Sequence, residues 1–243
     1  MIPKIIILYG PPNSGKGTQS FFLKEKLSSY YHLDFGSELR SFVKENIGDF
    51  HINEEHINPD ISPKILEISR RIRDRMKNNL PVETPDLRFV IEKTITDCVE
   101  RDQGMIIEGP GRLVEEAKWL SGFMGQKELS VAIFHLYASL EEVLERSGTR
   151  YYIPSTKKPF TSYEEAKSAC QENEEPYRRP EDEDREGTKQ RYRMLYADNF
   201  AKIISIYQKQ AKSMVLTVDA SQEIEDVSKD ILDYFKIFYN ENI

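Results

Sequence analysis

The chain is poor in cysteine and has no long apolar run, and both shortages exclude classes of protein. Its 243 residues contain only two cysteines, Cys98 and Cys170, far apart in the sequence. Such a pair does not form a disulfide framework, so we expect a reducing compartment, the cytoplasm. No apolar stretch approaches the length of a membrane-spanning helix. Residues 1–8 are too short for a signal peptide, and we expect no membrane partner.

Basic charge is also in short supply. The chain has 34 lysines and arginines against 41 acidic residues, which gives a formal net charge of −7 at pH 7. A general nucleic-acid binder needs a basic surface for phosphate contacts, so we expect no nucleic-acid partner. Hydrophobic residues at 39% and charged residues at 31% fit a globular protein. The length suits one large domain with inserts, or two small domains.

A glycine-rich loop after an apolar run is the strongest positive signal. Residues 5–9, Ile-Ile-Ile-Leu-Tyr, predict a buried parallel strand. The strand ends at Gly10, and the loop leads through Lys16 and Thr18 into an expected helix. Successive N–H groups of such a loop, with the start of the helix, can bind phosphate. Lys16 can then reach the outer phosphates, and the Thr18 hydroxyl faces the phosphate and metal side.

The residue order in this loop points to one family. The general phosphate-loop pattern has Ser or Thr directly after the lysine, whereas residues 15–19 read Gly-Lys-Gly-Thr-Gln. This order resembles the nucleoside monophosphate kinases, and among them the adenylate kinases most closely, over nearly the whole chain. The resemblance implies an ATP-binding set of Asn13, Ser14, Gly15, Lys16, Gly17, Thr18, Arg146, Arg150 and Gln222.

Two further segments resemble the family's acceptor site. Residues 34–40 resemble Ser-Thr-Gly-Asp-x-Leu-Arg, which implies that Arg40 binds the acceptor's phosphate, and the alternative is a solvated helix cation. Residues 80–86 resemble the segment whose backbone packs on the acceptor base, although Phe35 replaces the usual threonine beside that base. The implied acceptor set is Phe35, Gly36, Arg40, Leu80, Pro81, Val82, Gly109, Arg112 and Glu116.

A third strand is expected at residues 104–107, and its end resembles the family's Asp-Gly-Phe-Pro-Arg turn. Ligands gather at the carboxyl ends of strands in α/β sheets. There Glu108 can hold the water shell of Mg²⁺, and Arg112 can fork onto a phosphate. Glu116 takes the place of an adenine-reading glutamine. Because a carboxylate only accepts hydrogen bonds, it suits adenine, cytosine or guanine and disfavours uracil. An exposed helix glutamate is an equal alternative.

Residues 151–185 differ from the rest in their prolines, many charges and weak periodicity. The arginines on either side resemble those that flank the family's mobile lid, and Arg191 sits near the last of them. The spacing there is one residue longer than the family's, which allows Arg193 or a bulge. Cys170 alone cannot hold a structural zinc, so we expect none. The implied catalytic set is Lys16, Arg112, Arg150, Arg179 and Arg191.

These signals predict an α/β fold of the P-loop nucleoside triphosphate hydrolase type. We expect a doubly wound, parallel, five-stranded sheet that also uses residues 30–35, 131–137 and 214–218, with a long helix over 187–211 that ends near Tyr207. The core would comprise 1–34, 91–149 and 192–243, the nucleoside-monophosphate-binding insert 35–90, and the lid insert 150–191.

The resemblance implies transfer of the γ-phosphoryl of ATP to AMP with Mg²⁺, giving two ADP. Such transfer depends on positioning and charge neutralisation, so we expect no general base. A kinase of GMP, CMP or a small metabolite stays open, as does a non-catalytic nucleotide sensor. One site per chain makes a monomer adequate.

Overall fold

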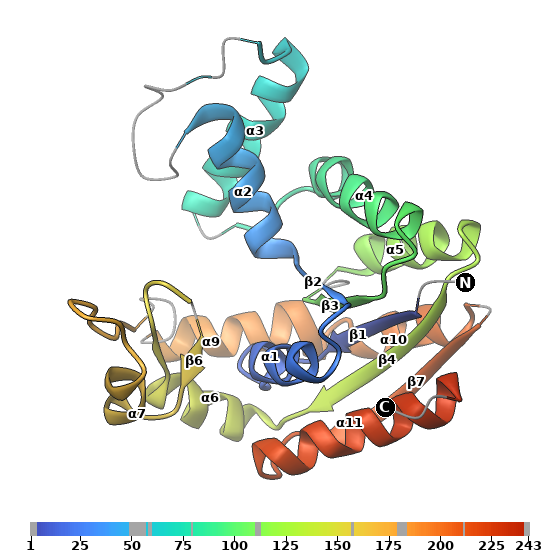
Figure 1. Cartoon of the computed structure of the whole chain (residues 1–243). Coiled ribbons are helices and arrows are strands. Elements are labelled where there is room, and N and C mark those ends of the chain that lie inside the picture. Colours follow the sequence, from blue (N-terminus) through green and yellow to red (C-terminus); the bar gives the residue numbers. More distant parts are fainter. Residues whose placement is uncertain are drawn as a thin grey trace. The chain divides into compact units, whose positions relative to one another are not determined.

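The computed structural model describes residues 4–48, 57, 60–78, 80–109, 113–156, 158–178, 184–210 and 212–240 (Figure 1). The chain divides into two compact units. Residues 33–103 form the first, and residues 2–32 with 104–243 form the second. Among the described helices, none combines the length and the apolar character that a bilayer crossing requires.

A five-stranded parallel sheet in the order β2-β3-β1-β4-β7 organises the second unit. Ile5 of β1 is level with Met105 of β3 on one side and with Val131 of β4 on the other. From Ile5 to Tyr9 no residue is more than 3% exposed, as the apolar run predicts. The predicted fold class is therefore confirmed. The strands are β1 (Lys4–Tyr9), β2 (Tyr31–Asp34), β3 (Met105–Glu108), β4 (Ser130–Tyr137) and β7 (Ser213–Asp219).

Helices cover both faces of this sheet. On one face α1 packs against α11, and on the other α10 packs against α5. A small antiparallel pair, β5 (Tyr151–Tyr152) with β6 (Pro159–Phe160), and the short helix α7 (Tyr163–Ser168) occupy the stretch for which the sequence showed little periodicity. The other helices of the unit are α1 (Lys16–Lys26), α5 (Val114–Gln126), α6 (Leu140–Thr149), α9 (Arg185–Tyr192), α10 (Phe200–Gln208) and α11 (Ile224–Tyr239).

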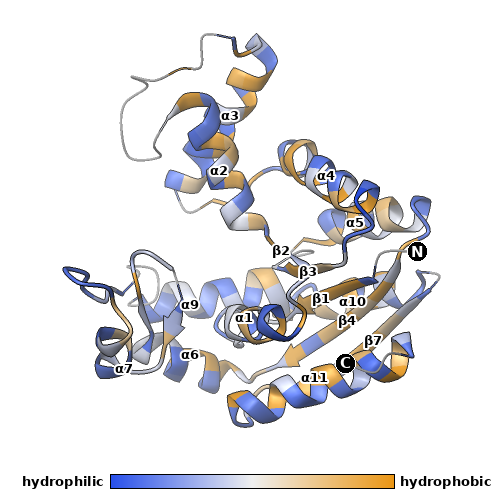
Figure 2. Ribbon diagram, viewed as in Figure 1, coloured by the Kyte–Doolittle hydropathy of each residue, from blue (hydrophilic) through white to orange (hydrophobic). Residues whose placement is uncertain are grey.

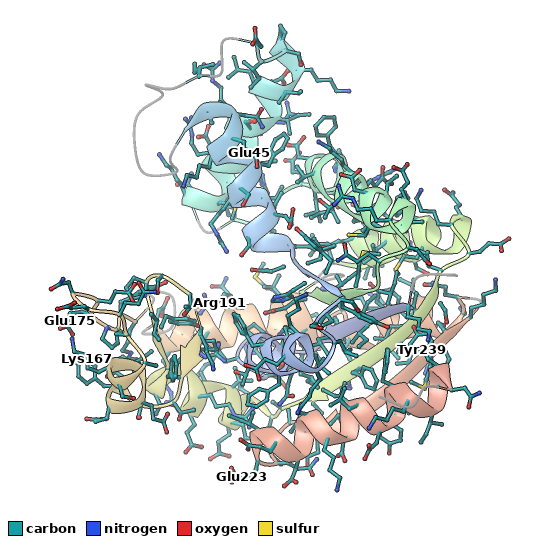
Figure 3. The ribbon with its side chains drawn as sticks, in the orientation of Figure 1. Glu45, Lys167, Glu175, Arg191, Glu223 and Tyr239 are labelled. Carbon is teal, nitrogen blue, oxygen red and sulfur yellow. The ribbon has the colours of Figure 1, made fainter. Side chains whose placement is uncertain are left out.

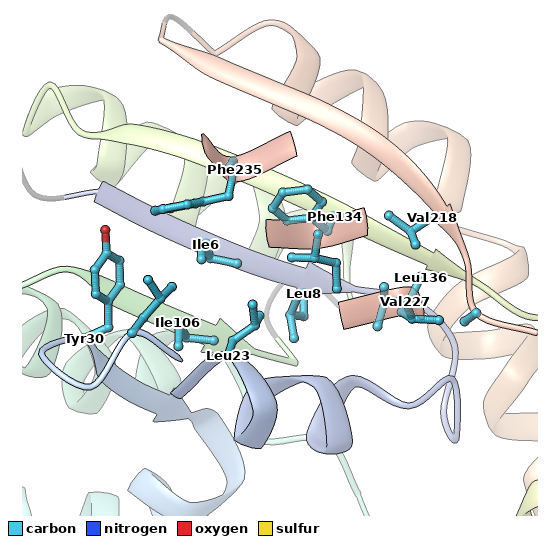
Figure 4. Close-up of a cluster of buried hydrophobic side chains, with 14 residues drawn as sticks. Ile6, Leu8, Leu23, Tyr30, Ile106, Phe134, Leu136, Val218, Val227 and Phe235 are labelled. Carbon is cyan, nitrogen blue, oxygen red and sulfur yellow. The ribbon is translucent and has the colours of Figure 1, made fainter. Parts of the chain in front are cut away.

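The apolar core of this unit lies between the sheet and the α1/α11 layer. Figure 4 shows Leu8, Leu23, Phe134 and Phe235 together there, from β1, α1, β4 and α11, and each is fully buried. Figure 2 shows orange strands and an α11 with alternating apolar and polar residues. This alternation is the pattern of a helix that buries one side only, so α11 closes the core.

The long helix expected over residues 187–211 is interrupted, whereas its expected end near Tyr207 is confirmed, because α10 ends at Gln208. Helix α9 gives way to a π-helical turn, η1 (Arg193–Ala197), before α10 begins. In this turn the Asp198 N–H donates to the Arg193 carbonyl, five residues back, at 3.0 Å. A π-turn inserts about one residue into a helix and leaves the apolar pattern on each side intact. Apolar periodicity alone therefore does not reveal it.

Three helices with capped or proline-marked starts are found among the described residues of the first unit. The Asp34 carboxylate caps α2 (Phe35–Ile47) by accepting the Gly36 N–H at 3.0 Å. Ser62 caps α3 (Pro63–Lys77), which has proline in its first turn, as does α4 (Thr84–Glu100). The α2 helix packs against both α3 and α4. The Arg71 guanidinium of α3 forks onto the buried Asp86 carboxylate of α4, at 2.9 and 2.7 Å.

Two substitutions on α11 test the core. Phe235 is 0% exposed, so Phe235→Ala should lower the free energy of unfolding by about 3–5 kcal/mol through lost burial and a cavity. The control, Ile237→Ala, lies on the same helix at a position 75% exposed and should change it by less than about 0.5 kcal/mol. Urea unfolding followed by circular dichroism measures both. Equal losses would show that α11 does not bury the face described.

Candidate active site

The glycine-rich loop joins the carboxyl end of β1 to the start of α1, and its shape requires glycine. A side chain at Gly10 would lie 2.5 Å from the Leu136 carbonyl oxygen. Gly15 has φ 90, a left-handed conformation that glycine adopts without strain, and Asn13 has φ 58. Within the described part of the chain no side chain caps α1, and the first N–H groups of a helix are the ones that can bind an anion. We call residues 10–18 the phosphate loop.

Lys16 lies over this loop. Its ammonium donates to the Pro11 carbonyl at 2.6 Å and to the Gly10 carbonyl at 3.1 Å. These bonds tie the charge to the loop's own backbone. The one fixed positive charge of the loop therefore stands beside the N–H groups that can bind an anion.

Glu108 ends β3 next to the phosphate loop. It is level with Leu8 in the sheet, and its Oε1 would lie 3.2 Å from a Cβ added at Gly17. A side chain at position 17 would therefore require the Glu108 carboxylate to shift slightly. Glu108 Oε2 lies 3.2 Å from His32 Nε2, and the sequence analysis missed this partner. Glu108 ends the expected third strand and His32 lies within the expected second strand, so membership of one parallel sheet was the available signal.

Two of the expected ATP-binding arginines contact other expected ATP-binding segments. Arg150 Nη1 donates to Asn13 Oδ1 of the phosphate loop at 3.0 Å and to the Tyr152 hydroxyl at 3.3 Å. Arg146 donates to the carbonyl of Ala220, in the turn that also holds Gln222. The structure thus joins the end of α6 to the loop and to the turn after β7. Arg191 lies on α9 (Figure 3). Its Nη2 donates to Thr188 Oγ1 at 3.0 Å.

The first unit carries the expected acceptor residues that precede Gly109. Arg40 is half exposed on α2, with its Nη2 3.3 Å from Ser37 Oγ and 3.9 Å from an Asp34 oxygen. Phe35 is 4% exposed, and Leu80 is 50% exposed. The Arg75 Nε of α3 donates to the Pro81 carbonyl at 2.6 Å and so fixes the 80–82 segment.

The remaining expected residues belong to the second unit or lie outside the described residues. Arg112 and Arg179 fall in ranges that the structure does not describe. Gly109 is described, with φ 76. Glu116 is 6% exposed on α5 and its Oε2 accepts the Leu113 N–H at 3.4 Å. The alternative interpretation of Glu116, an exposed helix glutamate, is therefore wrong.

A buried histidine supports the sheet behind the phosphate loop, and the sequence analysis missed it. His135 of β4 is level with Tyr9, and its Nε2 lies 2.8 Å from the Tyr196 hydroxyl. Its Nδ1 lies 3.1 Å from Thr217 Oγ1 of β7, and its ring is 4.4 Å from that of Phe200. Burial, with a smaller effect of the Lys16 charge, lowers the pKa of His135 to about 4.

This shift makes the free energy of unfolding depend on pH. The unfolded chain protonates His135 near its ordinary pKa of about 6.5, whereas the folded chain resists protonation down to about 4. Stability is therefore complete above about pH 7 and falls by roughly 3 kcal/mol as the pH drops through this window. Urea unfolding at pH 7.5 and pH 4.5 should show this loss in the native chain and a smaller one in His135→Gln. Identical losses in both would contradict the assignment.

Comparison with known proteins gives consistent similarities. Residues 9–152, more than half of the chain, match the sequence model of a family described as "AAA domain". The chain is 29% identical over 230 residues to the protein named adenylate kinase of Chloroherpeton thalassium, covering 93% of this chain and 95% of that one. It is 28% identical over 234 residues to the adenylate kinase of Kosmotoga olearia, covering 93% and 96%. It is also 28% identical over 233 residues to that of Chlamydia muridarum, covering 95% and 87%.

Proposed function

This chain belongs to the AAA domain family and is a divergent member of the adenylate kinase family, a phosphotransferase, and from that premise we propose that it transfers the γ-phosphoryl of ATP to AMP. The products are two ADP, and the nucleotide carries Mg²⁺. One observation carries the proposal. The phosphate loop holds Lys16 on its carbonyls, Arg150 on Asn13 and Glu108 beside Gly17 in one place.

The chemistry needs this arrangement more than it needs an acid or a base. Phosphoryl transfer proceeds with charge on the oxygens of the moving group, so catalysis is positioning and charge neutralisation. The N–H groups of residues 13–18 bind the triphosphate, and Lys16 and Arg150 neutralise it. Arg191, with Arg112 and Arg179, completes the cationic set. Arg146 and the turn of Gln222, joined through the Ala220 carbonyl, lie beside the adenine of ATP.

Mg²⁺ fits the donors at this edge of the sheet. Among the described residues no group of three or more His, Cys, Asp or Glu side chains can hold a metal. The phosphates of ATP and water would then supply most of its ligands, and the bound ion would supply positive charge that offsets the charge of the phosphates. Thr18 and Glu108 would hold it, Glu108 through hydrogen bonds from metal-bound water.

The acceptor is bound by the residue set that the family resemblance implies, and most of this set belongs to the first unit. Arg40 binds its phosphate, and the backbone of Leu80, Pro81 and Val82, which Arg75 fixes, packs on its base. Phe35, Gly36, Gly109 and Arg112 complete this set. Core, acceptor insert (35–90) and lid (150–191) act as three parts. We also propose a cytoplasmic monomer that binds neither nucleic acid nor membranes, in line with the acidic charge and paucity of cysteine.

Glu116 favours a second candidate, a kinase of GMP. Its carboxylate is buried, and its Oε2 accepts the Leu113 N–H at 3.4 Å. A carboxylate only accepts hydrogen bonds, and guanine offers two donors on one edge whereas adenine offers a single amino group. Which base the enzyme prefers therefore depends on which hydrogen-bond donors of the acceptor base the Glu116 carboxylate binds.

A coupled assay tests the proposal. Purified protein, Mg²⁺ and ATP are mixed with AMP, GMP, CMP, UMP or small alcohols, and ADP formation is followed. We expect turnover with AMP, weaker turnover with the other amino-bearing bases and least with UMP, which offers Glu116 no amino group. Faster turnover with GMP would select the second candidate. ATP binding without turnover on any acceptor would refute the kinase assignment and favour a nucleotide sensor.

Substitution of Lys16 tests the role of the phosphate loop. Lys16→Ala removes the charge held on the Pro11 carbonyl and should lower kcat by at least about 10²-fold with the fold intact. Arg112→Ala should lower kcat by about 10³-fold or more, because the proposal places Arg112 on the phosphoryl group in transfer. Lys26→Ala, at the exposed far end of the same α1 helix, is the matched control and should leave kcat unchanged. Near-normal turnover in Lys16→Ala would remove the lysine from the mechanism.

A further inference from the structure

The π-turn η1 has stabilising contacts of its own. Besides the Asp198 N–H bond to Arg193, the Asn199 side chain donates to the Met194 carbonyl at 2.8 Å. The Asn199 N–H donates to the Tyr196 carbonyl at 3.0 Å. These bonds satisfy carbonyls that the wider turn would otherwise leave to solvent. The turn is therefore a specified feature of this chain, and π-turns occur frequently at functional sites.

A side chain of this turn is anchored in the sheet. Tyr196 is 5% exposed, and its hydroxyl lies 2.8 Å from His135 Nε2 on β4. His135 Nδ1 in turn meets Thr217 Oγ1 on β7 at 3.1 Å. The rings of Tyr9 and Phe200 surround the pair, with centroids 5.3 to 6.2 Å from that of Tyr196. A neutral imidazole has one donor and one acceptor nitrogen, so it can bridge the two hydroxyls. The position of η1 is thus tied to β4 and β7.

The elements on the two sides of η1 have different neighbours. On one side α10 packs against α5 and β7, in the layer that covers the sheet. On the other side α9 packs against α6, the helix that carries Arg146 and leads into Arg150. Arg191 stands two residues before η1 begins, near the end of α9. The turn therefore joins a helix fixed to the sheet to a helix that carries a proposed phosphate-binding arginine.

The extra residue of a π-turn has a simple geometric effect. Each residue of an α-helix turns the chain by about 100° and advances it by about 1.5 Å. One inserted residue therefore rotates α9 about its axis by roughly that angle relative to α10. Such a rotation decides the direction in which Arg191 projects from α9 relative to α10.

We propose that η1, held by the Tyr196–His135–Thr217 contacts, orients Arg191 toward the phosphates of ATP. Tyr196 and His135 are then positioning residues that act through Arg191 and touch no substrate. This inference rests on the proposed function only in assigning Arg191 to the ATP phosphates.

A double-mutant cycle on ATP affinity tests the inference. The affinity for Mg·ATP, without acceptor, is measured by calorimetry in the native chain, Tyr196→Phe, Arg191→Ala and the double variant. Tyr196→Phe should weaken binding about 5- to 10-fold in the native chain and by less than about 2-fold once Arg191 is removed, because the two residues act as one unit. Thermal unfolding of each variant shows that it folds.

Tyr239→Phe is the matched control. Its hydroxyl lies 2.7 Å from the Ser130 carbonyl oxygen and also contacts the Ile5 backbone. Both partners lie at the start of their strands, at the opposite end of β1 from the phosphate loop. Losing these bonds should lower the melting temperature and leave Mg·ATP affinity unchanged. The inference is overturned if Tyr196→Phe has no effect on affinity, or an equal effect with and without Arg191. Because the cycle reads binding alone, failure of phosphoryl transfer in the coupled assay would refute the proposed function without altering this result.

Discussion

The parallel register that holds β1 between β3 and β4 is the constraint on which the site depends. Leu8 is level with Glu108 and Tyr9 with His135, so the phosphate loop begins where a carboxylate and an imidazole stand on the neighbouring strands. Parallel strands bring their carboxyl ends to one edge of a sheet, which is where ligands collect. A slip of one residue would turn each of these side chains to the opposite face. The loop, its acidic neighbour and its buried support therefore follow from one alignment of backbone hydrogen bonds.

The partners of the cations at the phosphate loop differ from those of a structural arginine. Lys16 donates to the loop's own carbonyls, and Arg150 donates to Asn13, so neutral oxygens help to hold two cations at the loop. Neutral partners leave the positive charge available to an anion, whereas an ion pair would compensate it. Arg71 shows the contrast in the first unit, where two carboxylates hold it as a structural residue.

The sequence was sufficient for features that are local or periodic. The isoleucine run of β1, the five strands and the glycine pattern of the loop each carry their signal within a few residues, and the structure confirms the fold class. The missed features join distant residues. His32 meets Glu108 across 76 positions, and His135 meets Tyr196 across 61. The π-turn escaped because an inserted residue changes helix phase without changing composition. The burial of Glu116 likewise depends on tertiary packing that no local pattern encodes.

The central claim is that backbone N–H groups of residues 13–18 bind phosphate, and the amide ¹H–¹⁵N spectrum of the protein titrated with inorganic tripolyphosphate tests it most directly. This ligand has no base, so only phosphate contacts can move the signals. The account predicts saturable shifts concentrated in the amides of residues 13–18, with little change on α11. Shifts of equal size spread over the surface, or confined to residues outside the loop, would contradict it.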